Sequence, residues 1–365
     1  MPGTPSADLF AAESHAAIDT LPADCDALFA TATSLFARRA WWRIAVSDAL
    51  PAGARPDFVL IRRGGRPAGL FPMLRQAGLT AFTTPYTCLY TPLIAADADP
   101  VAVCRAFGRY CKANASTRLD ALPLEWPYRD AAIAGFRAAG LAVRPFDHFG
   151  NWHETVNGLG WSGYLANRPG ALRETVRRRL RRAERVADAR FTLITSAEGL
   201  EDGLAWFESV YAKSWKEPEP FPNFNAAHMR AAAADGIIRL GIWSVGEQPV
   251  AVQFWMVEHG QATVLKLAHD EAYKAHSPGT VLTALMLRHL MDQDCVDSID
   301  FGRGDDPYKR DWAACRRQRI GLLLINPWAP LGAIQLARHG LGRLRGRLRR
   351  LLRPSPPTPP PGAVT

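Results

Sequence analysis

The first half of the chain alternates short apolar runs with amphipathic segments. Two apolar runs that flank a Gly-Gly turn form a hairpin pattern over residues 58–74. Further apolar runs predict strands at residues 79–84, 88–94 and 119–124. Apolar residues spaced three and four apart predict helices at residues 101–113 and 129–139. We therefore expect a mixed domain of helices and strands that ends near residue 155.

The second half opens with an amphipathic helix over residues 171–187. Its apolar face carries Leu172, Val176 and Leu180, and arginines fill most of the remainder. A second helix is predicted at residues 200–213, followed by three antiparallel strands at 237–244, 249–258 and 261–270. The pattern then predicts a helix at 280–291, a strand at 298–301, a short helix and a strand at 320–325. We expect the packed core to end near residue 327.

The composition fits two packed domains followed by an extension. The chain has 365 residues, of which 48% are hydrophobic and 22% are charged. We expect domains over residues 1–160 and 161–327, and their similar mix of elements suggests a diverged duplication. Residues 328–365 combine Leu, Gly and Arg with a Pro-rich end. This composition predicts a basic amphipathic helix and a disordered tail.

The charge balance points to an acidic partner. Lys and Arg number 44 against 35 Asp and Glu, so the net charge is +9, and Arg dominates the excess. A coenzyme, a nucleic acid or an anionic lipid would suit such a chain. The six cysteines form neither a Cys-x-x-Cys pair nor the spacing of a zinc site. We therefore expect reduced thiols and no bound metal.

The sequence predicts a cytoplasmic protein. The first 35 residues contain five acidic residues and no Lys or Arg, which is the reverse of a secretory signal. No run of 18 or more apolar residues predicts a membrane-spanning helix. Near the end, four leucines share one helical face, at Leu341, Leu344, Leu348 and Leu351, and arginines cover the rest. This pattern fits either peripheral contact with an anionic membrane through residues 331–353 or a helix docked on the protein itself.

The segment from Lys266 to Thr280 predicts an anion-binding cradle. A strand runs into a loop whose Ser-Pro-Gly-Thr sequence opens a helix, and unpaired N–H groups at a helix start attract anions. Gly279 would let a pyrophosphate approach the backbone, and Lys274 would supply positive charge. The same residues also fit an ordinary helix start, with Ser277 as the cap and Pro278 at the first helical position.

A second candidate cluster follows the strand at 298–301. Asp300 ends the strand, and Gly302 and Gly304 flank Arg303. Acidic, phenolic and ammonium groups then share one loop, a common place for functional side chains, at Asp305, Asp306, Tyr308 and Lys309. A solvated turn that carries an ion pair is the structural alternative.

These segments carry a family resemblance. The order of two helices, three antiparallel strands, a Gly-containing loop, a helix and a strand resembles the GNAT acyltransferase fold. The run Lys274-Ala-His-Ser-Pro-Gly279 is similar to its pyrophosphate loop, Arg/Gln-x-x-Gly-x-Gly/Ala, with Lys for Arg and Ser for the first Gly. With the Asp-Phe-Gly-Arg-Gly-Asp-Asp-Pro-Tyr-Lys run at 300–309 and the Lys-Ser-Trp-Lys run at 213–216, it resembles the CelD/BioF2-like branch, related to FemAB-type transferases.

The resemblance implies an α/β (α+β) fold of two GNAT-like mixed-sheet domains in tandem, with the acyl-CoA loop in the second. It implies acetyl-CoA or a longer acyl-CoA as donor and an amine as acceptor. The strand at 261–270 would pair with the pantetheine arm, and an N–H near Leu267 or Ala268 would face the thioester oxygen. Lys274, Ser277, Gly279 and Thr280 would hold the pyrophosphate.

Proton transfer then needs an acid and a base near the thioester. Asp270 is the predicted base or amine-positioning group, and Tyr308 or Tyr273 is the predicted acid. His269 and His276 are alternatives, because histidine titrates near neutral pH.

Three functions remain open at this point. The first is an acyl-CoA-dependent N-acyltransferase that acts on a small molecule, a saccharide or a lipid precursor. The second is a FemAB-like transferase that takes its group from aminoacyl-tRNA, for which the basic helix would grip RNA. The third is a non-catalytic protein that binds membrane or nucleic acid through its arginine-rich helices, with salt-dependent affinity. The predicted cradle favours the first function and makes nucleic acid a less favoured partner.

Overall fold

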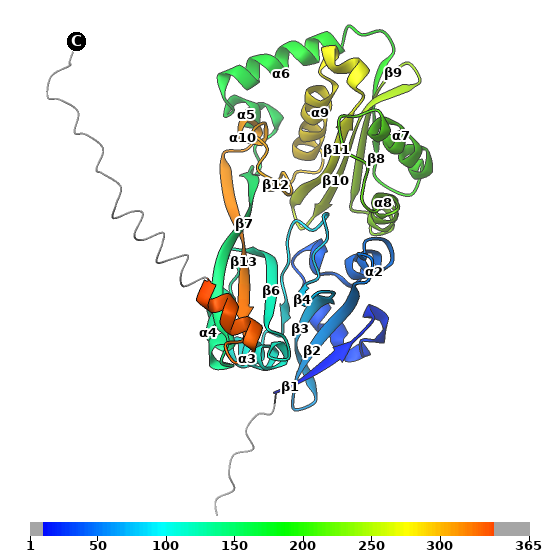
Figure 1. Ribbon diagram of the computed structural model, residues 1–365. Helices are drawn as coiled ribbons and strands as arrows, with labels where there is room; N and C mark the ends of the chain where they lie inside the picture. The colour runs from blue at the N-terminus through cyan, green and yellow to red at the C-terminus, as the bar shows by residue number, and fades with distance from the viewer. Residues whose placement is uncertain (1–9, 339–365) are drawn as a thin grey trace, which may run out of the picture.

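The computed structural model describes residues 10–338, and its strands join in one continuous sheet (Figure 1). The strands are β1 (Phe10–His15), β2 (Arg55–Arg63), β3 (Arg66–Arg75), β4 (Leu79–Ala81), β5 (Leu93–Ile94), β6 (Ser116–Pro123), β7 (Ala142–Thr155), β8 (Ala189–Ile194), β9 (Ile238–Val245), β10 (Gln248–Glu258), β11 (Gln261–His269), β12 (Ser298–Asp300) and β13 (Cys315–Ile325). Along the sheet they run in the order β1-β2-β3-β4-β6-β13-β7-β12-β11-β10-β9-β8, and β5 pairs with β3.

The helices cover both faces of this sheet. The α-helices are α1 (Asp26–Phe29), α2 (Arg39–Asp48), α3 (Pro100–Cys111), α4 (Arg129–Ala138), α5 (Trp161–Ala166), α6 (Gly170–Ala183), α7 (Leu200–Ala212), α8 (Phe224–Ala234), α9 (Pro278–Asp292) and α10 (Lys309–Trp312). Four short 3₁₀ helices accompany them: η1 (Ile18–Thr20), η2 (Ala23–Cys25), η3 (Leu35–Ala37) and η4 (Glu271–His276).

The same order of elements occurs twice along the chain. Residues 10–155, the first repeat, and residues 189–325, the second repeat, each contain a strand, helices, three antiparallel strands, a helix, a strand, a helix and a last strand. In both repeats the third antiparallel strand pairs in parallel with the strand after the helix, β4 with β6 and β11 with β12. This repetition confirms the predicted tandem fold and gives the suspected duplication a structural form.

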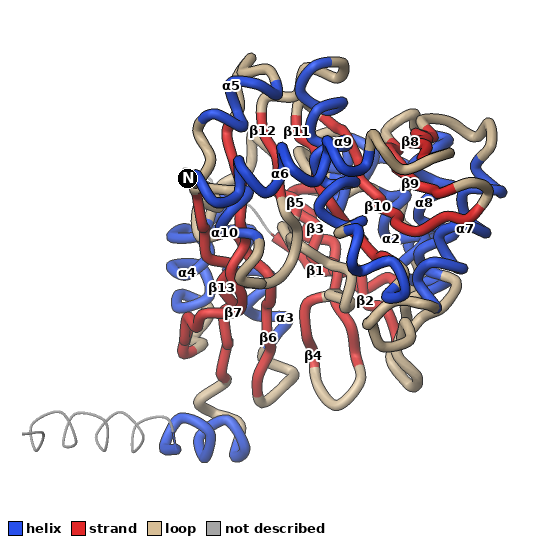
Figure 2. Tube along the Cα trace, turned by 90° about the horizontal axis from the view of Figure 1, so that it is seen from above, coloured by secondary structure: helices blue, strands red, loops and turns tan. Residues whose placement is uncertain are grey.

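The two repeats exchange their last strands. β7 lies beside β12 of the second repeat, and β13 lies beside β6 of the first repeat. β7 and β13 pair with each other in antiparallel fashion along the whole of β13 (Figure 2). The predicted boundaries at residues 160 and 327 follow these two strands. Because the last strands cross over, one sheet connects the repeats without a gap.

Two apolar cores lie on opposite faces of the second repeat's sheet. One core packs α5, α6 and α9 against this sheet. The other core joins α7 and α8 to the first repeat, where the ring of Trp41 on α2 meets the rings of Phe224 and His228 on α8. The two repeats therefore share a buried apolar contact as well as a sheet.

Several predicted elements need correction. The predicted strand at 88–94 is a strand only at Leu93–Ile94, because residues before it line a cavity between the repeats, at Cys88, Leu89 and Thr91. β7 was not predicted, because polar residues along this strand break the simple apolar alternation. α8 was not predicted either, because it is short and rich in alanine.

The C-terminal part of the chain is described only in part. Residues 330–338 are helical, and Trp328, Leu331 and Ile334 are exposed. The predicted leucine face from Leu341 to Leu351 and the Pro-rich tail lie outside the described residues. Within residues 10–338, each helix is too short or too polar to cross a lipid bilayer.

Candidate active site

The second repeat contains a split between two neighbouring parallel strands. β12 pairs with β11 only at Gln261, Ala262 and Thr263, whereas β11 continues to His269. The register between β10 and β11 shifts just beyond this pairing, so β11 bulges near Val264. Gly302 crosses the bulge with φ +67°, and a Cβ atom there would lie 2.5 Å from the carbonyl oxygen of Val264. Only glycine therefore lets the chain leave β12 in this direction.

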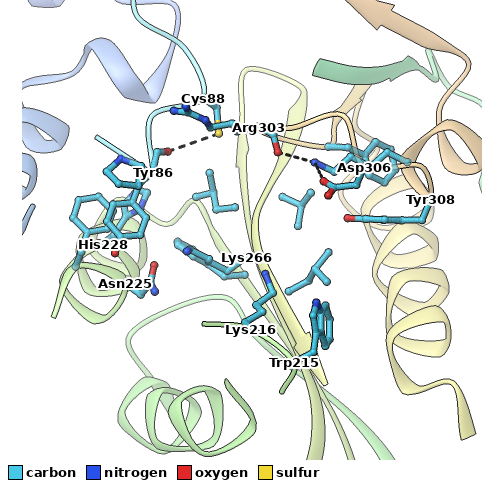
Figure 3. A pocket seen from close by; sticks show the side chains of 18 residues that line it. Tyr86, Cys88, Trp215, Lys216, Asn225, His228, Lys266, Arg303, Asp306 and Tyr308 are labelled. Atoms are coloured by element: carbon cyan, nitrogen blue, oxygen red, sulfur yellow. Dashed lines mark hydrogen bonds and ion pairs between the residues drawn. The ribbon is translucent and has the colours of Figure 1, made fainter. Parts of the chain in front are cut away.

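A cavity of about 340 Å³, here called the transfer cavity, opens at this split (Figure 3). Its walls come from β11, from the loop after β4 in the first repeat, from α8 and the loop before it, and from the loop after β12. The polar lining side chains are Tyr86, Cys88, Lys216, Asn225, His228, Lys266, Arg303, Asp306, Tyr308 and Lys309. Both repeats thus build the cavity, and the second repeat supplies most of its charge.

Two lysines enter the transfer cavity side by side but differ in their partners. Lys266 on β11 forms an ion pair with Glu219, and its Nζ lies 4.7 Å from the centre of the Tyr86 ring. Lys216 follows α7, and its Nζ lies 5.7 Å from the ring centres of both Tyr211 and Trp215. Burial, together with nearby Lys266, lowers the pKa of Lys216.

The loop after β12 closes another wall of the cavity. Lys309 is 4% exposed, and its Nζ donates to the carbonyl oxygen of Arg303 at 2.7 Å and pairs with Asp306 at 3.0 Å. Tyr308 points its hydroxyl into the cavity (Figure 3). Desolvation raises the pKa of Tyr308, so its phenol stays protonated at neutral pH. The loop therefore presents a hydrogen-bond donor beside a fixed ammonium group.

The predicted anion cradle forms the start of α9. Ser277 has the left-handed conformation, φ 53° and ψ 51°, and its side chain makes no capping hydrogen bond. Gly279 and Thr280 belong to the first turn of α9, where N–H groups have no partner within the helix. A Cβ atom on Gly279 would lie 3.3 Å from Nδ1 of His269. Lys274 is mostly exposed and pairs with Glu271 at 3.2 Å.

The other predicted site residues connect the cradle to the cavity. Leu267 lines the transfer cavity, and Ala268 next to it is buried in the sheet. The ring of His269 lies 4.5 Å from that of Trp215, which lines the cavity, and burial lowers the pKa of His269. The last residues of β11 therefore connect the transfer cavity to the cradle at the start of α9.

Asp270 and Tyr273 have local contacts of their own. Asp270 is buried, and its carboxylate accepts a hydrogen bond from the backbone N–H of Ala272 at 2.9 Å, which caps η4. Tyr273 packs against the core formed by α5, α6 and α9, 6.3 Å from the ring of His276. Among the predicted proton-transfer residues, Tyr308 is the one placed on the wall of the transfer cavity.

The arginine-rich helix α6 lies beside the cradle (Figure 1). Arg179 reaches the carbonyl oxygen of Ala275 in η4 at 3.5 Å. Other arginines of this helix are exposed to solvent, at Arg177, Arg178, Arg181 and Arg182. Positive charge therefore surrounds the start of α9, where an anion would already meet free N–H groups.

A second cavity of about 340 Å³, the interface cavity, lies between the repeats near the start of β11. Cys88 lines both cavities. Asp300 borders the interface cavity and is held by Asn151 at 2.7 Å and by Arg317 at 2.5 Å. Glu125 reaches both Arg317 and Arg319, at 3.5 and 2.9 Å. Asp300 is thus fully engaged in a buried network that joins β7, β12 and β13.

Several residues of the transfer cavity were not predicted from the sequence. Tyr86 comes from the first repeat, and Asn225 and His228 come from the missed helix α8. Lys216 belongs to the Lys-Ser-Trp-Lys run that contributed to the family resemblance, so that run was the available signal for it. Tyr86 is brought to the site by the packing of the two repeats, and Asn225 and His228 by the packing of α8 on the sheet of its own repeat.

Comparisons with known proteins agree with this architecture. The chain is similar to a solved structure of FemX, with 11% identity, a TM-score of 0.56, and coverage of 86% of this chain and 98% of that one. A conserved protein of unknown function from Bacteroides thetaiotaomicron is similar over 83% of this chain and 91% of that one, with 13% identity and a TM-score of 0.51. A tandem GNAT protein from the clavulanic acid biosynthesis pathway has 11% identity and a TM-score of 0.48, over 86% of this chain and 98% of that one.

These structural similarities concern the fold. The set of curated proteins contained no match to the chain. The family model for the acetyltransferase (GNAT) domain matches residues 170–310. This range includes α6, β11, the start of α9 and most of the loop after β12. The second half of the chain therefore contains a GNAT acyltransferase domain, which includes the split strands and most of the transfer cavity.

Proposed function

We propose that the protein transfers an acyl group from a coenzyme A thioester to the amine of a small molecule, a saccharide or a lipid precursor. The observation that carries this proposal is the split between β11 and β12. At this split the edge of β11 is free between two features. One is the start of α9, where no side chain caps the helix and a pyrophosphate could bind, and the other is the transfer cavity with its amine and phenol side chains. A thioester donor needs these two features at a fixed separation along one strand.

In this proposal the donor lies along the free edge of β11. The pantetheine arm pairs with β11 beyond Thr263, where β12 has left the sheet. An N–H near Leu267 or Ala268 faces the thioester oxygen as an oxyanion donor. Ser277, Gly279 and Thr280 hold the pyrophosphate through the first turn of α9, and Lys274 adds positive charge.

The proton-transfer roles follow from the positions of the side chains. Tyr308 donates a hydrogen bond to the reacting group, because its phenol stays protonated and points into the transfer cavity. His269 at the end of β11 and Tyr273 within η4 remain candidates beside the path. Asp270 keeps a positioning role, since its carboxylate caps η4 and so fixes the loop before the cradle. The acceptor enters from the first-repeat side, past Tyr86 and Cys88.

Binding titrations test the donor directly. Purified protein is titrated with acetyl-CoA, a long-chain acyl-CoA and free CoA, by calorimetry and by thermal shift. A ligand at 100 times its Kd adds about 2.7 kcal/mol of stability, so we expect a clear rise in melting temperature. Saturable binding of the three compounds supports the proposal. Failure of all three to bind overturns it and directs the next titration to aminoacyl-tRNA.

A second candidate function is transfer from aminoacyl-tRNA. The exposed arginines of α6 favour it, because a row of guanidinium groups next to the site would suit an RNA backbone. The structural similarity to FemX is compatible with this function but concerns the fold. The two donors differ in salt dependence, since binding through many phosphates weakens steeply with salt. Tight, strongly salt-dependent binding of charged tRNA without binding of CoA would favour this second function.

We also propose peripheral contact with an anionic membrane for a protein located in the cytoplasm. The exposed side chains of Trp328, Leu331 and Ile334 give the described start of the C-terminal segment an apolar surface. The arginines that follow in the sequence would meet lipid phosphates. Sedimentation with vesicles that contain phosphatidylglycerol, compared with vesicles of phosphatidylcholine alone, tests this contact.

A further inference from the structure

The two lysines of the transfer cavity have opposite electrostatic environments. Lys266 is bound to Glu219, which also accepts from the hydroxyl of Tyr211. Its charge is therefore compensated within the protein. In the described part of the chain, the Nζ atom of Lys216 has no carboxylate oxygen within 4 Å, and it lies 5.7 Å from the ring centres of Tyr211 and Trp215. The same cavity thus holds one paired ammonium group and one unpaired amine.

The backbone holds Lys216 in place. The hydroxyl of Ser214 donates to the carbonyl oxygen of Tyr211 at 2.7 Å and accepts from the N–H of Lys216 at 3.4 Å. Pro218, Pro220 and Pro222 follow and restrict the loop. Figure 3 shows Lys216 and Lys266 extending into the same space, with Tyr308 on the opposite side. Lys216 is therefore directed into the transfer cavity by a braced turn.

Burial is the largest effect that lowers the pKa of Lys216, and the charged groups around it act in both directions. The positive charges of Lys266 on β11 and of Lys309 at the start of α10 lower the pKa of Lys216. The carboxylates of Glu219 and Asp306 raise the pKa of Lys216. Glu219 already pairs with Lys266, however, and Asp306 already pairs with Lys309. The Nζ atom of Lys216 also lies 5.7 Å from the ring centres of Tyr211 and Trp215.

We propose that Lys216 is the catalytic base that takes the proton from the acceptor amine during transfer. The inference rests on the proposed function and adds the residue that the reaction needs but that the predicted base, Asp270, does not supply at the cavity wall. Neutral Lys216 accepts a proton as the bond between the acceptor nitrogen and the thioester carbon forms. The bond between that carbon and the coenzyme sulfur breaks, and the sulfur leaves as a thiolate.

Lys216 then returns the proton to the thiolate. The products are an amide and the free thiol of coenzyme A, and the enzyme regains its neutral lysine. Tyr308 stays protonated throughout and donates a hydrogen bond, which agrees with its raised pKa. Because one side chain both accepts and returns the proton, no further acid or base is required.

The protonation of Lys216 is measured first, without any substrate. The folded full-length protein is labelled with isotopic acetic anhydride between pH 6 and pH 11, and each lysine is quantified by peptide mass spectrometry. Limited access slows labelling but does not move the pH at which an amine becomes reactive. Lys213 is the internal control, because it is exposed and lies three residues away. We expect the midpoint of Lys216 to lie below that of Lys213.

Turnover is measured next, as thiol release from acetyl-CoA with a panel of primary amines that includes glucosamine and spermidine. Lys216→Arg replaces an amine that can be neutral with a group that stays charged, and we expect it to lower kcat at least 100-fold with acetyl-CoA affinity unchanged. The wild-type rate rises with pH through the midpoint found by labelling, and this limb disappears in Lys216→Arg. Lys213→Arg is expected to retain both the rate and the pH profile.

Two results overturn the inference. The first is a labelling midpoint for Lys216 equal to or above that of Lys213. The second is a Lys216→Arg variant, or a Lys216→Gln variant if the former does not fold, that retains the wild-type rate and pH profile. Failure of acetyl-CoA to bind overturns the proposed function instead. The labelling midpoint, which needs no donor, then still decides whether Lys216 carries a neutral amine.

Discussion

Equivalent helices of the two repeats begin in different ways. α3 and α9 both follow the third antiparallel strand of their repeat, and both have proline at the first position, Pro100 and Pro278. At α3 the carboxylate of Asp99 accepts from the N–H of Val101 at 2.9 Å. At α9 the Ser277 side chain makes no such bond. A fixed carboxylate therefore occupies the anion-binding end of α3, whereas the end of α9 is available to a phosphate.

The splits between parallel strands next to these helices also differ: the split is filled in the first repeat and open in the second. β4 pairs with β6 over only two residues of each strand, and β11 pairs with β12 over only three. In the first repeat, buried Tyr90 fills the space: its N–H donates to Ala121 O at 2.9 Å and its hydroxyl donates to Pro72 O at 3.0 Å. In the second repeat the transfer cavity opens there.

The two repeats therefore have different roles although they share one fold. The first repeat keeps the strand order and helix order but closes both the helix end and the split with its own side chains. It then contributes a wall, with Tyr86 and Cys88, to the cavity of the second repeat. One carboxylate and one tyrosine thus account for much of the difference between a scaffold and a binding site.

The largest effect is expected when α9 is made to resemble α3. Gly279→Asp places a carboxylate in the first turn of α9, where it repels a pyrophosphate and occupies its space. An acidic residue in the first turn favours the helix itself, so the fold should persist. We expect calorimetry to show at least a 100-fold loss of CoA affinity, about 2.8 kcal/mol.

Gly78→Asp is the matched control for this variant, since a Cβ atom at Gly78 meets nothing within 4 Å. It should retain the wild-type affinity. Unchanged CoA affinity in Gly279→Asp would show that α9 does not hold the phosphates.

The next effect concerns the contact between the repeats. His228 on α8 is buried against Trp41, and desolvation lowers its pKa to about 3. The unfolded chain binds the proton near pH 6.5, so the native state loses stability as the pH falls from 6.5 toward 3 and none is lost above 6.5. Between pH 6.5 and pH 5 this amounts to about 2 kcal/mol. Urea unfolding of wild type and His228→Gln at pH 7.5 and pH 5 measures the difference.

His228→Gln should lose less stability on acidification than wild type does, whatever its stability at pH 7.5. His259→Gln, at an exposed position, should lose as much stability between pH 7.5 and pH 5 as wild type does. An identical pH dependence in wild type and His228→Gln would mean that protons reach His228 in the folded protein.

A smaller effect is expected at the start of α3. Asp99→Ala removes the carboxylate that caps this helix and should lower the free energy of unfolding by about 1 kcal/mol. CoA affinity should not change, because the first repeat holds no donor in this proposal. Thermal unfolding and calorimetry on the same sample measure both quantities. Asp97→Ala, at a neighbouring exposed position, controls for the loss of charge; weaker CoA binding in Asp99→Ala alone would place the donor near α3.

The smallest effect is expected at the matching position of α9. Ser277→Ala should change the free energy of unfolding by less than about 0.5 kcal/mol, because the Ser277 side chain makes no capping bond. Measured beside Asp99→Ala, it compares the two helix starts directly. A loss as large as that of Asp99→Ala would show that Ser277 caps α9 in solution, and the cradle would then be closed in both repeats.

Much of the second repeat was predictable from its sequence. The strands β9, β10 and β11 follow the predicted runs closely, as do α7 and α9, because these elements have long, regular apolar patterns. The start of α9 was predictable as well, since Pro278 and Gly279 mark a helix beginning. The acyltransferase family was recognisable from the runs around residues 266–280 and 300–309.

Other parts of the site were hidden by their context. α8 carries His228 and Asn225, but its alanine-rich sequence has little periodicity. Asp270 looked like a base at a strand end, and the structure shows its carboxylate bound to the N–H of Ala272. Hydrogen bonds of this kind depend on the turn that the chain makes and leave no pattern in the sequence.

The sequence by itself determined the alternation of helices and strands, the basic charge and the loop that begins α9, because these depend on neighbours within a few residues. The tertiary structure alone decided the exchange of β7 and β13, the closure of the first split by Tyr90, and the pairing of Lys266 with Glu219. Those contacts join residues far apart in the chain. The unpaired state of Lys216 is of this second kind, since a charge is compensated by what the fold places beside it.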